Sequence, residues 1–597
     1  MCGFFLAHSF HKKLNFKKLE KSANLIQHRG PDQEKNFFNE FTYSKFFRLK
    51  ILDLSDDAMQ PMMDHNKRYL LLFNGEIYNF KELNISKLKN KINNKHSDTA
   101  TLFELLIKFG DKALDMIEGM FSFVFFDFNK KRILFGRDRF GMKPLFYYHS
   151  KEEIIFSSEI KPILNYKNIK SFNIGTMYDY FLKGSMDHND QTFFENIKCL
   201  QPGEKGVFYN KKLTINRYWS IIQNSIKNLI PINTEKNLKQ LLMESIDKHL
   251  ISDRKIGLFL SGGSDSTALA HLLTQKLKNS FNTYTYGFKN DDKFSEINKA
   301  EITINNLEIK NFSYEVTAEY VINNMEKMTN ILESPFTSIR LFGLEALYKQ
   351  LQKEDTKVII EGDGGDEIFG GYDYNYFPYL LDTFKKDNLK IFNKLLEFAK
   401  LKKNSFNSQF EYVENLIKTY TYQYGSTSDG TPFLNVDFFN KDLLNQHIDE
   451  NFFNDKFEKN FQKLQKLKKS QYRDIYSIKL PRALKYKDRI SMHYGIETRI
   501  PFLDHKFAET SFNLNNNFKI KDLDTRYLFK KILRSITKNK IRFKKTKFSI
   551  ADPQTQWMMS DLREYVNDNL RSSYFKNLDF FDHKQIIKSY ENFCNND

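Results

Sequence analysis

The second residue of the chain is a cysteine, and its position gives it a chemistry that an internal cysteine lacks. If Met1 is removed, Cys2 carries both a thiol and the α-amine of the chain. An α-amine has an ordinary pKa of about 7.7–8.0, which suits a general base at neutral pH. The position predicts an N-terminal nucleophile whose own amine activates its thiol, although a cysteine here can also be incidental.

A second reactive segment is a glycine-rich loop near the middle of the chain. The apolar run Ile256–Leu260 leads into Ser261–Ser266, which reads SGGSDS, and a helical pattern starts at Thr267. Two glycines let the backbone wrap around an anion, and the N–H groups of the loop and helix start supply a positive field. The spacing fits neither a Walker A loop nor a dinucleotide-binding fingerprint. A plain glycine-rich turn is the alternative.

A third segment, Glu361–Tyr372, is rich in glycine and carboxylates and follows the apolar run Val358–Ile360. Carboxylates at the ends of buried strands can hold Mg²⁺ against phosphate oxygens. The two glycine-rich segments together favour a site for phosphate groups and Mg²⁺.

Ordered motifs in the first part of the chain resemble the glutaminase domain of class II glutamine amidotransferases, particularly that of the asparagine synthetases. The matching motifs are Met1–Gly3, His28–Asp32, Arg48, Gln60–Pro61, Asn74–Asn79, Ser97–Asp98, Glu118–Phe123, Gly136–Gly141, Lys143–Leu145 and Ser158–Lys161. The resemblance implies that Cys2 attacks the side-chain amide of glutamine. It also implies an oxyanion hole formed by the side-chain amide of Asn74 and the backbone N–H of Gly75.

The resemblance also implies how the rest of glutamine is held. Arg48 would bind the α-carboxylate with its planar fork. Asp98 would bind the α-ammonium, with Glu76 assisting. The family often has His before this arginine, whereas this chain has Phe47. Taken singly, Arg48 and Asp98 would be ordinary surface charges.

The loop at Ser261 resembles the pyrophosphate-binding loop of ATP pyrophosphatases, which the asparagine synthetases carry at the same place in their order. It implies cleavage of ATP between the α- and β-phosphates and an acyl-adenylate of the substrate carboxylate. Asp265 and Asp366 are the implied Mg²⁺ ligands, and Glu361 stands where the family usually has Ser. The implied ATP contacts are Leu260, Ser261, Gly262, Gly263, Asp265, Ser266, Tyr286, Glu361 and Gly362.

The segments Lys487–Met492 and Glu497–Asp504 match the C-terminal signature of the same family. Lys545 corresponds to a family lysine that stabilises charge developing at the adenylate, a role that suits a compact cation. This segment departs from the family pattern at Lys547, where Gly is common, and Lys544 is also adjacent. A solvated basic turn is the alternative reading.

The elements that must position these residues divide the chain in two. From Cys2 to about Trp219, short apolar runs alternate with turns, which predicts an α+β domain with antiparallel strands. The resemblance implies a four-layer αββα sandwich for this domain. Farther along, longer helical patterns and short buried strands such as Asn282–Phe288 predict an α/β domain with a parallel sheet and a largely helical C-terminal part. We expect a glutaminase domain over 2–212 and a synthetase domain over 233–597.

Composition narrows the function classes. The net charge is +18 over 597 residues, but lysine is spread along the chain and mixed with acids, so we expect no nucleic-acid partner. The densest basic run, Lys459–Arg473, has apolar residues at helical spacing and predicts an amphipathic helix. Three cysteines fit a reducing compartment, and no apolar run is long enough to predict a membrane span. We expect a cytoplasmic protein.

The resemblance implies that ATP, aspartate, glutamine and water give AMP, pyrophosphate, asparagine and glutamate. It also implies an internal tunnel for ammonia and a homodimer. One alternative keeps the mechanism but amidates another carboxylate, such as a sugar acid. A synthetase that has lost its glutaminase is disfavoured by the retention of Cys2, Asn74 and Asp98, and a non-catalytic binding protein is disfavoured by the intact loop and Asp366.

Overall fold

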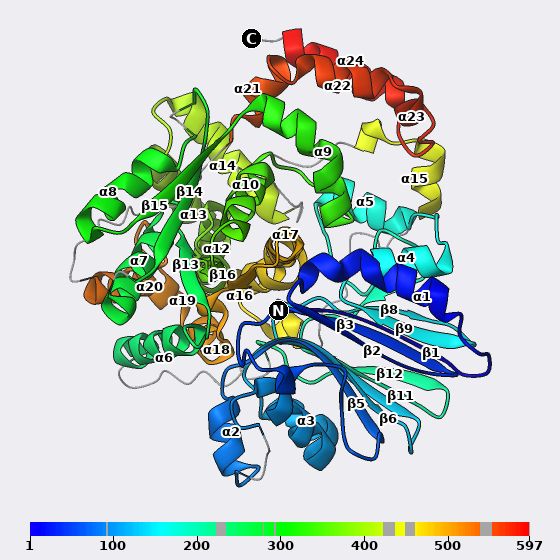
Figure 1. Cartoon of the computed structure of the whole chain (residues 1–597). Helices are drawn as coiled ribbons and strands as arrows, with labels where there is room; N and C mark the ends of the chain where they lie inside the picture. Colours follow the sequence, from blue (N-terminus) through cyan, green and yellow to red (C-terminus); the bar gives the residue numbers. More distant parts are fainter. Residues whose placement is uncertain are drawn as a thin grey trace.

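A computed structural model describes residues 1–90, 94–222, 234–278, 280–291, 294–421, 436–447, 460–537 and 552–595. Its N-terminal part is built on two six-stranded antiparallel sheets (Figure 1). The first sheet, in spatial order, is β10 (Ile197–Cys199), β8 (Phe146–His149), β9 (Glu153–Ser157), β1 (Gly3–Ser9), β3 (Thr42–Arg48) and β2 (Gln33–Asn39). The second is β12 (Lys212–Arg217), β11 (Glu204–Tyr209), β7 (Arg132–Arg137), β6 (Gly119–Asp127), β5 (Tyr69–Ile77) and β4 (Met62–Met63).

Both faces of strand β1 are buried, which explains its continuous apolar run. Phe4 and Leu6 pack with Leu70 and Leu72 of the second sheet, whereas Phe5 packs on the opposite face. The outer layers are α1 (Phe16–Ala23) and α4 (Lys161–Lys167) on the first sheet, and α2 (Phe80–Ser86) and α3 (Asp98–Phe109) on the second. The four-layer αββα sandwich is therefore confirmed.

The second part contains a five-stranded parallel sheet. Its spatial order is β15 (Asn311–Val316), β14 (Asn282–Phe288), β13 (Lys255–Phe259), β16 (Thr356–Ile360) and β17 (Glu497–Arg499). Its faces are covered by α7 (Ser264–Leu277) and α8 (Ile297–Leu307) on one side and by α9 (Ala318–Leu332) and α10 (Arg340–Gln352) on the other. The strand order reverses between β13 and β16, the position at which open parallel sheets bind ligands beyond the carboxyl ends of their strands.

The C-terminal part is largely helical, as expected. Its longer helices are α12 (Tyr376–Phe384), α13 (Asn388–Lys400), α14 (Phe406–Thr421), α16 (Lys466–Arg473), α17 (Leu480–His493), α18 (His505–Asn513), α20 (Tyr527–Ile536), α22 (Arg563–Arg571) and α24 (His583–Asn595). Helix α17 lies between the sandwich and the parallel sheet in Figure 1, and it contacts the short helix Asn24–Arg29 of the sandwich. The two parts are therefore in contact through α17.

The amphipathic helix expected over Lys459–Arg473 is shorter than the sequence pattern indicates. Lys459 lies outside the described residues, Leu464 is extended, and α16 begins only at Lys466. The carboxylate of Asp382 accepts hydrogen bonds from the backbone N–H groups of Lys466 and Leu467, both at 2.9 Å, and so fixes this start. None of the helices in the described part of the chain has the length and apolar character needed to cross a bilayer.

Candidate active sites

Cys2 lies immediately before β1 and next to Asn74 of β5. The backbone N–H of Cys2 donates to Asn74 Oδ1 at 2.9 Å. Asn74 is fully buried, and its Nδ2 has no hydrogen-bond partner among the described residues. A buried amide donor without a partner is unusual, and beside a thiol it suits stabilisation of an oxyanion. The structure therefore brings together the predicted nucleophile and the predicted oxyanion donor.

Gly75 follows Asn74 where β5 approaches β6 closely. It has φ +153°, and a Cβ atom here would lie 2.1 Å from the carbonyl oxygen of Met120. Only glycine fits this approach, so the backbone beside Asn74 keeps its position.

Two buried carboxylates complete the wall of this site. Asp98, the first residue of α3, accepts hydrogen bonds from the N–H groups of Ile77 at 3.0 Å and Thr99 at 2.7 Å. Burial raises the pKa of Asp98 to about 6. Burial, and then the charge of Asp98, raise the pKa of Glu76 well above its usual range. Arg499 and the chain-start amine oppose this effect at Glu76, so the wall offers two buried carboxylates to an ammonium group.

Arg48 is the last residue of β3, and its side chain is buried. Burial is compatible both with binding a ligand and with a structural role. Its guanidinium donates to Ser55 O at 2.5 Å, to Asp53 O, and to Gln33 Oε1 at 3.0 Å. These bonds hold the loop that follows β3, so in this arrangement Arg48 spends its donors on protein oxygens.

The chain start is enclosed between the two parts of the protein. Met1 is buried, and its amine donates to Glu497 Oε2 at 2.9 Å. Burial alone would raise the pKa of Glu497, but this amine and Arg499 lower it to about 2. The pKa of the Cys2 thiol is raised by burial. The amine of Met1 opposes this effect.

The second site is a cavity of about 680 Å³ at the carboxyl ends of β13 and β16. Every sequence-predicted nucleotide or metal residue of the described part of the chain lines it. These residues are Leu260, Ser261, Gly262, Gly263, Asp265, Ser266, Tyr286, Glu361, Gly362 and Asp366. The loop is fixed by the Ser261 and Ser266 hydroxyls, 3.0 Å apart, and by a 3.2 Å bond from the Ser266 hydroxyl to Gly263 O. Lys545, like Lys544 and Lys547, lies outside the described residues.

Asp265 and Asp366 converge on one cation, the guanidinium of Arg526. Nη1 of Arg526 contacts both carboxylate oxygens of Asp265, at 2.8 and 2.6 Å, and its Nε lies 3.2 Å from Asp366 Oδ1. Two carboxylates that face the same cation fit the oxygen donor set of Mg²⁺. Sequence reasoning missed Arg526, because nothing in the segment before α20 marks it as a site residue.

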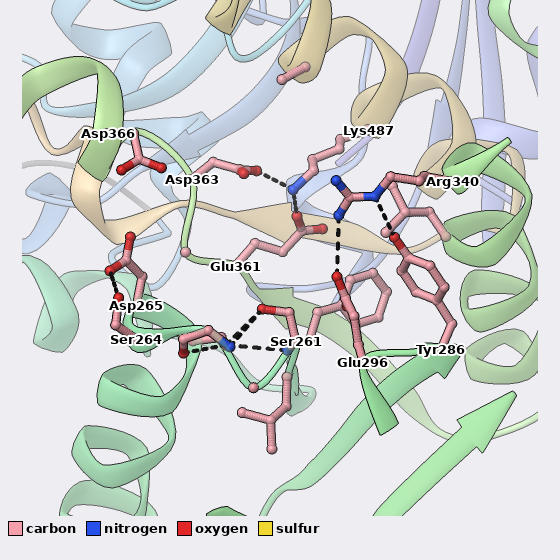
Figure 2. A pocket seen from close by; sticks show the side chains of 18 of the residues that line it. Ser261, Ser264, Asp265, Tyr286, Glu296, Arg340, Glu361, Asp363, Asp366 and Lys487 are labelled. Atoms are coloured by element: carbon pink, nitrogen blue, oxygen red, sulfur yellow. Dashed lines mark hydrogen bonds and ion pairs between the residues drawn. The ribbon is translucent and has the colours of Figure 1, made fainter. Parts of the chain in front are cut away.

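Glu361, where the resemblance implies Ser, is paired with neighbouring residues. Lys487 of α17 forms ion pairs with both Glu361 and Asp363, and Figure 2 shows its amine between the two carboxylates. The hydroxyl of Tyr348 donates to Glu361 Oε1 at 2.7 Å. Burial raises the pKa of Glu361, and the positive charge of Lys487 opposes this effect. Lys487 is therefore a specific counter-ion for this carboxylate.

The remaining wall of the cavity holds another ion pair, formed by Arg340 and Glu296. Arg340 Nε donates to Tyr286 Oη at 3.1 Å, and Arg340 Nη2 lies 3.2 Å from Glu296 Oε1 (Figure 2). Both cations and carboxylates thus line a cavity that is large enough for a nucleotide.

The comparisons with known proteins cover both parts of the chain. A model of the glutamine amidotransferase domain matches residues 1–219, and a model of asparagine synthase matches residues 237–595. The glutamine-hydrolyzing asparagine synthetase 1 of Bacillus subtilis (strain 168) is 26% identical over 100% of this chain and 93% of that protein. Synthetase 3 of the same organism is 25% identical, over 91% of this chain and 86% of that protein.

A fungal relative has a different name. Amidase chry2 of Gibberella zeae is 23% identical, over 98% of this chain and 93% of that protein. The asparagine synthase model alone matches more than half of the residues. Together with the amidotransferase match that precedes it, this shows that the chain belongs to the asparagine synthase family.

Proposed function

We propose that this protein is a glutamine-hydrolysing asparagine synthetase. Ammonia released from glutamine at Cys2 would be transferred to an aspartyl-adenylate made from aspartate and ATP, giving asparagine, AMP, pyrophosphate and glutamate. The coarser chemistry follows from the family: the protein is a glutamine-dependent ligase that uses ATP to amidate an acid.

The pairing of Cys2 with Asn74 is the observation that carries the proposal. Once Met1 is removed, the amine of Cys2 can accept the proton of its thiol, and the sulfur can attack the amide carbon of glutamine. The developing oxyanion would face Asn74 Nδ2, which has no partner in the described part of the chain, and the N–H of Gly75. Ammonia leaves, and water then cleaves the thioester to give glutamate.

The second half-reaction belongs to the cavity at Ser261. A carboxylate oxygen of the acceptor attacks the α-phosphorus of ATP, and pyrophosphate leaves. Ammonia then attacks the acyl carbon and AMP leaves. Asp265 and Asp366 would hold Mg²⁺, which neutralises phosphate charge when bound. Lys545 is proposed to stabilise the charge that develops at the adenylate.

The charges near Lys487 support aspartate as the acceptor. Glu361 and Asp363 together carry two negative charges against the single positive charge of Lys487. An acceptor with an α-ammonium group would balance the excess, whereas a sugar acid would not. The sugar-acid alternative has no comparable observation in its favour.

The proposal is tested by supplying Mg-ATP and glutamine with a panel of carboxylates and by measuring pyrophosphate and the amidated product. Aspartate should give equal amounts of pyrophosphate and asparagine. Product from a sugar acid but not from aspartate would overturn the acceptor, and no pyrophosphate with any acid would overturn the synthetase. Cys2→Ala should abolish the use of glutamine but keep synthesis from ammonium salts, and loss of both would contradict the two-site mechanism.

A further inference from the structure

Arg526 occupies an unusual place for a side chain that no sequence motif singles out. It is 5% exposed and precedes α20, and its guanidinium spans the gap between the loop at Ser261 and the segment at Glu361. Besides Asp265 and Asp366, it contacts Ser264 Oγ at 3.2 Å through Nη2. One cation therefore ties together the two acidic segments of the cavity.

The residues packed around Arg526 leave a space that fits its guanidinium. Gly371 lies against the ion pair: a Cβ atom there would be 2.0 Å from Asp366 Oδ1 and 2.7 Å from Arg526 Cδ. Arg526 Cζ also lies 6.0 Å from the ring centre of Phe529. A larger residue at position 371 would displace the pair, so the glycine preserves the space that the guanidinium fills.

We propose that Arg526 is an internal counter-ion that holds Asp265 and Asp366 until a nucleotide arrives, so that these carboxylates bind a divalent cation only together with ATP. This inference rests on the proposed function, because it takes Asp265 and Asp366 as the metal ligands. It makes Arg526 a positioning residue, which acts on the metal through the two carboxylates.

Charge and geometry explain why a metal ion would replace Arg526 at these two carboxylates only when ATP binds. A metal ion without nucleotide would have to displace a guanidinium that already makes charge-assisted bonds, and would leave that guanidinium buried beside another cation. A polyphosphate offers the planar guanidinium a new anionic partner in the same cavity. Binding of the metal and binding of ATP should therefore be linked, with each strengthening the other.

The first test needs only the intact protein. Mn²⁺ is titrated in place of Mg²⁺, and bound Mn²⁺ is measured by electron paramagnetic resonance with and without a non-hydrolysable ATP analogue. The wild-type protein should bind Mn²⁺ at this site only with the analogue. Tight Mn²⁺ binding by the wild-type protein without nucleotide, abolished by Asp366→Asn, would overturn the proposal.

The second test removes the counter-ion. Arg526→Met should gain Mn²⁺ binding without nucleotide, by about tenfold or more, because two buried carboxylates lose their partner. The double variant Arg526→Met with Asp366→Asn should lose the gain, and Arg526→Lys should remain close to the wild type. Arg340→Met is the matched control: it removes the same charge from the same cavity but frees the single carboxylate of Glu296.

The outcomes separate this inference from the proposed function. An equal gain in Arg340→Met would show that the general charge of the cavity matters rather than the position of Arg526, and would overturn the inference. Near-ultraviolet circular dichroism checks that each variant is folded, and the wild-type titration decides the matter if Arg526→Met is not. Failure of the proposed function would appear separately, as absence of pyrophosphate release by a protein that still shows the Mn²⁺ linkage.

Discussion

At the scale of single residues, Asn74 is the position where a loss of catalysis can best be distinguished from a loss of stability. We expect Asn74→Ala to lower the rate of glutamine hydrolysis by about 10²–10³, the usual cost of losing one oxyanion donor. Synthesis from ammonium salts should persist, because the cavity at Ser261 is unchanged. The measurement is glutamate release compared with ammonia-dependent pyrophosphate release.

A second buried asparagine in the same domain provides the control. The Asn84 side chain accepts a hydrogen bond from the Thr101 hydroxyl at 2.8 Å and lies on α2. Asn84→Ala should lower the melting temperature without a comparable loss of glutamine hydrolysis. A similar fall in hydrolysis for both variants would show that the Asn74 effect is structural.

Asp98 predicts a pH dependence whose sign follows from its burial. Its pKa is raised to about 6, above an ordinary value near 3.9. The folded protein therefore holds this proton more tightly than the unfolded chain, so the resulting stability is fully present below about pH 4 and is lost as the pH rises through about 6. An ammonium ligand needs the ionised carboxylate of Asp98. The affinity for glutamine should therefore increase as the pH rises from about 5 to about 7.

Calorimetric titration of Cys2→Ala with glutamine measures this dependence without turnover. Adding Asp98→Asn should weaken binding and flatten the pH profile over the same range. A profile that stays unchanged in Asp98→Asn would assign the titration to another group, such as Glu76, whose pKa is also raised by burial.

The sequence predicts most residues of the two sites, but not all residues of either site. Cys2, Asn74 and the loop at Ser261 carry sequence signals, because their chemistry requires those residue types in that order. Arg526 carries no such signal, since it reaches the cavity only through the packing of α20 against the parallel sheet. The charge balance of Glu361 with Lys487 also depends on residues 126 positions apart in the sequence, which local patterns do not pair.

At the scale of elements, β17 links the two sites. The sequence pattern does not predict this strand, because three residues with two charges lack the apolar pattern that marks buried strands. Its Arg499 carbonyl accepts a hydrogen bond from the N–H of Glu361 at 2.9 Å, while its Thr498 hydroxyl lies 2.8 Å from the hydroxyl of Tyr348. On the other face, the Arg499 guanidinium lies 3.6 Å from Glu76. The strand therefore touches the glutaminase wall and the nucleotide cavity at once.

We expect Arg499→Met to cost about 3–5 kcal/mol of folding free energy, because it leaves buried carboxylates without their partner. Arg499 contacts Glu497 at 2.6 Å and donates to the carbonyls of His249 and Ile251 at 2.8 and 2.6 Å. Urea unfolding measures the loss. The exposed pair of Lys255 and Asp355 is the comparison, and Lys255→Met should leave the unfolding midpoint unchanged. An equally small effect of Arg499→Met would mean that water reaches Glu497 and Glu76.

At the scale of the whole molecule, the proposed transfer of ammonia requires a closed interface between the two sites. Glu333 joins the two parts of the protein at that interface. It lies at the end of α9, accepts hydrogen bonds from the backbone N–H groups of Ile160 and Lys161 at 2.8 and 2.7 Å, and pairs with Arg489 at 2.8 Å. These contacts join the parallel-sheet domain to the start of α4 in the sandwich, at a distance along the chain that no local pattern predicts.

Glu333→Ala should loosen this junction without removing any group that touches the proposed substrates. Glutamine hydrolysis and ammonia-dependent synthesis, each measured alone, should be retained, but the glutamate formed per asparagine should rise above one because ammonia escapes to solvent. Glu326→Ala, an exposed position on the same helix, should keep the ratio at one. A ratio of one in both variants would show that the junction at Glu333 does not confine ammonia and that the seal lies elsewhere, with the contacts of β17 at Glu76 and Glu497 the next to be tested.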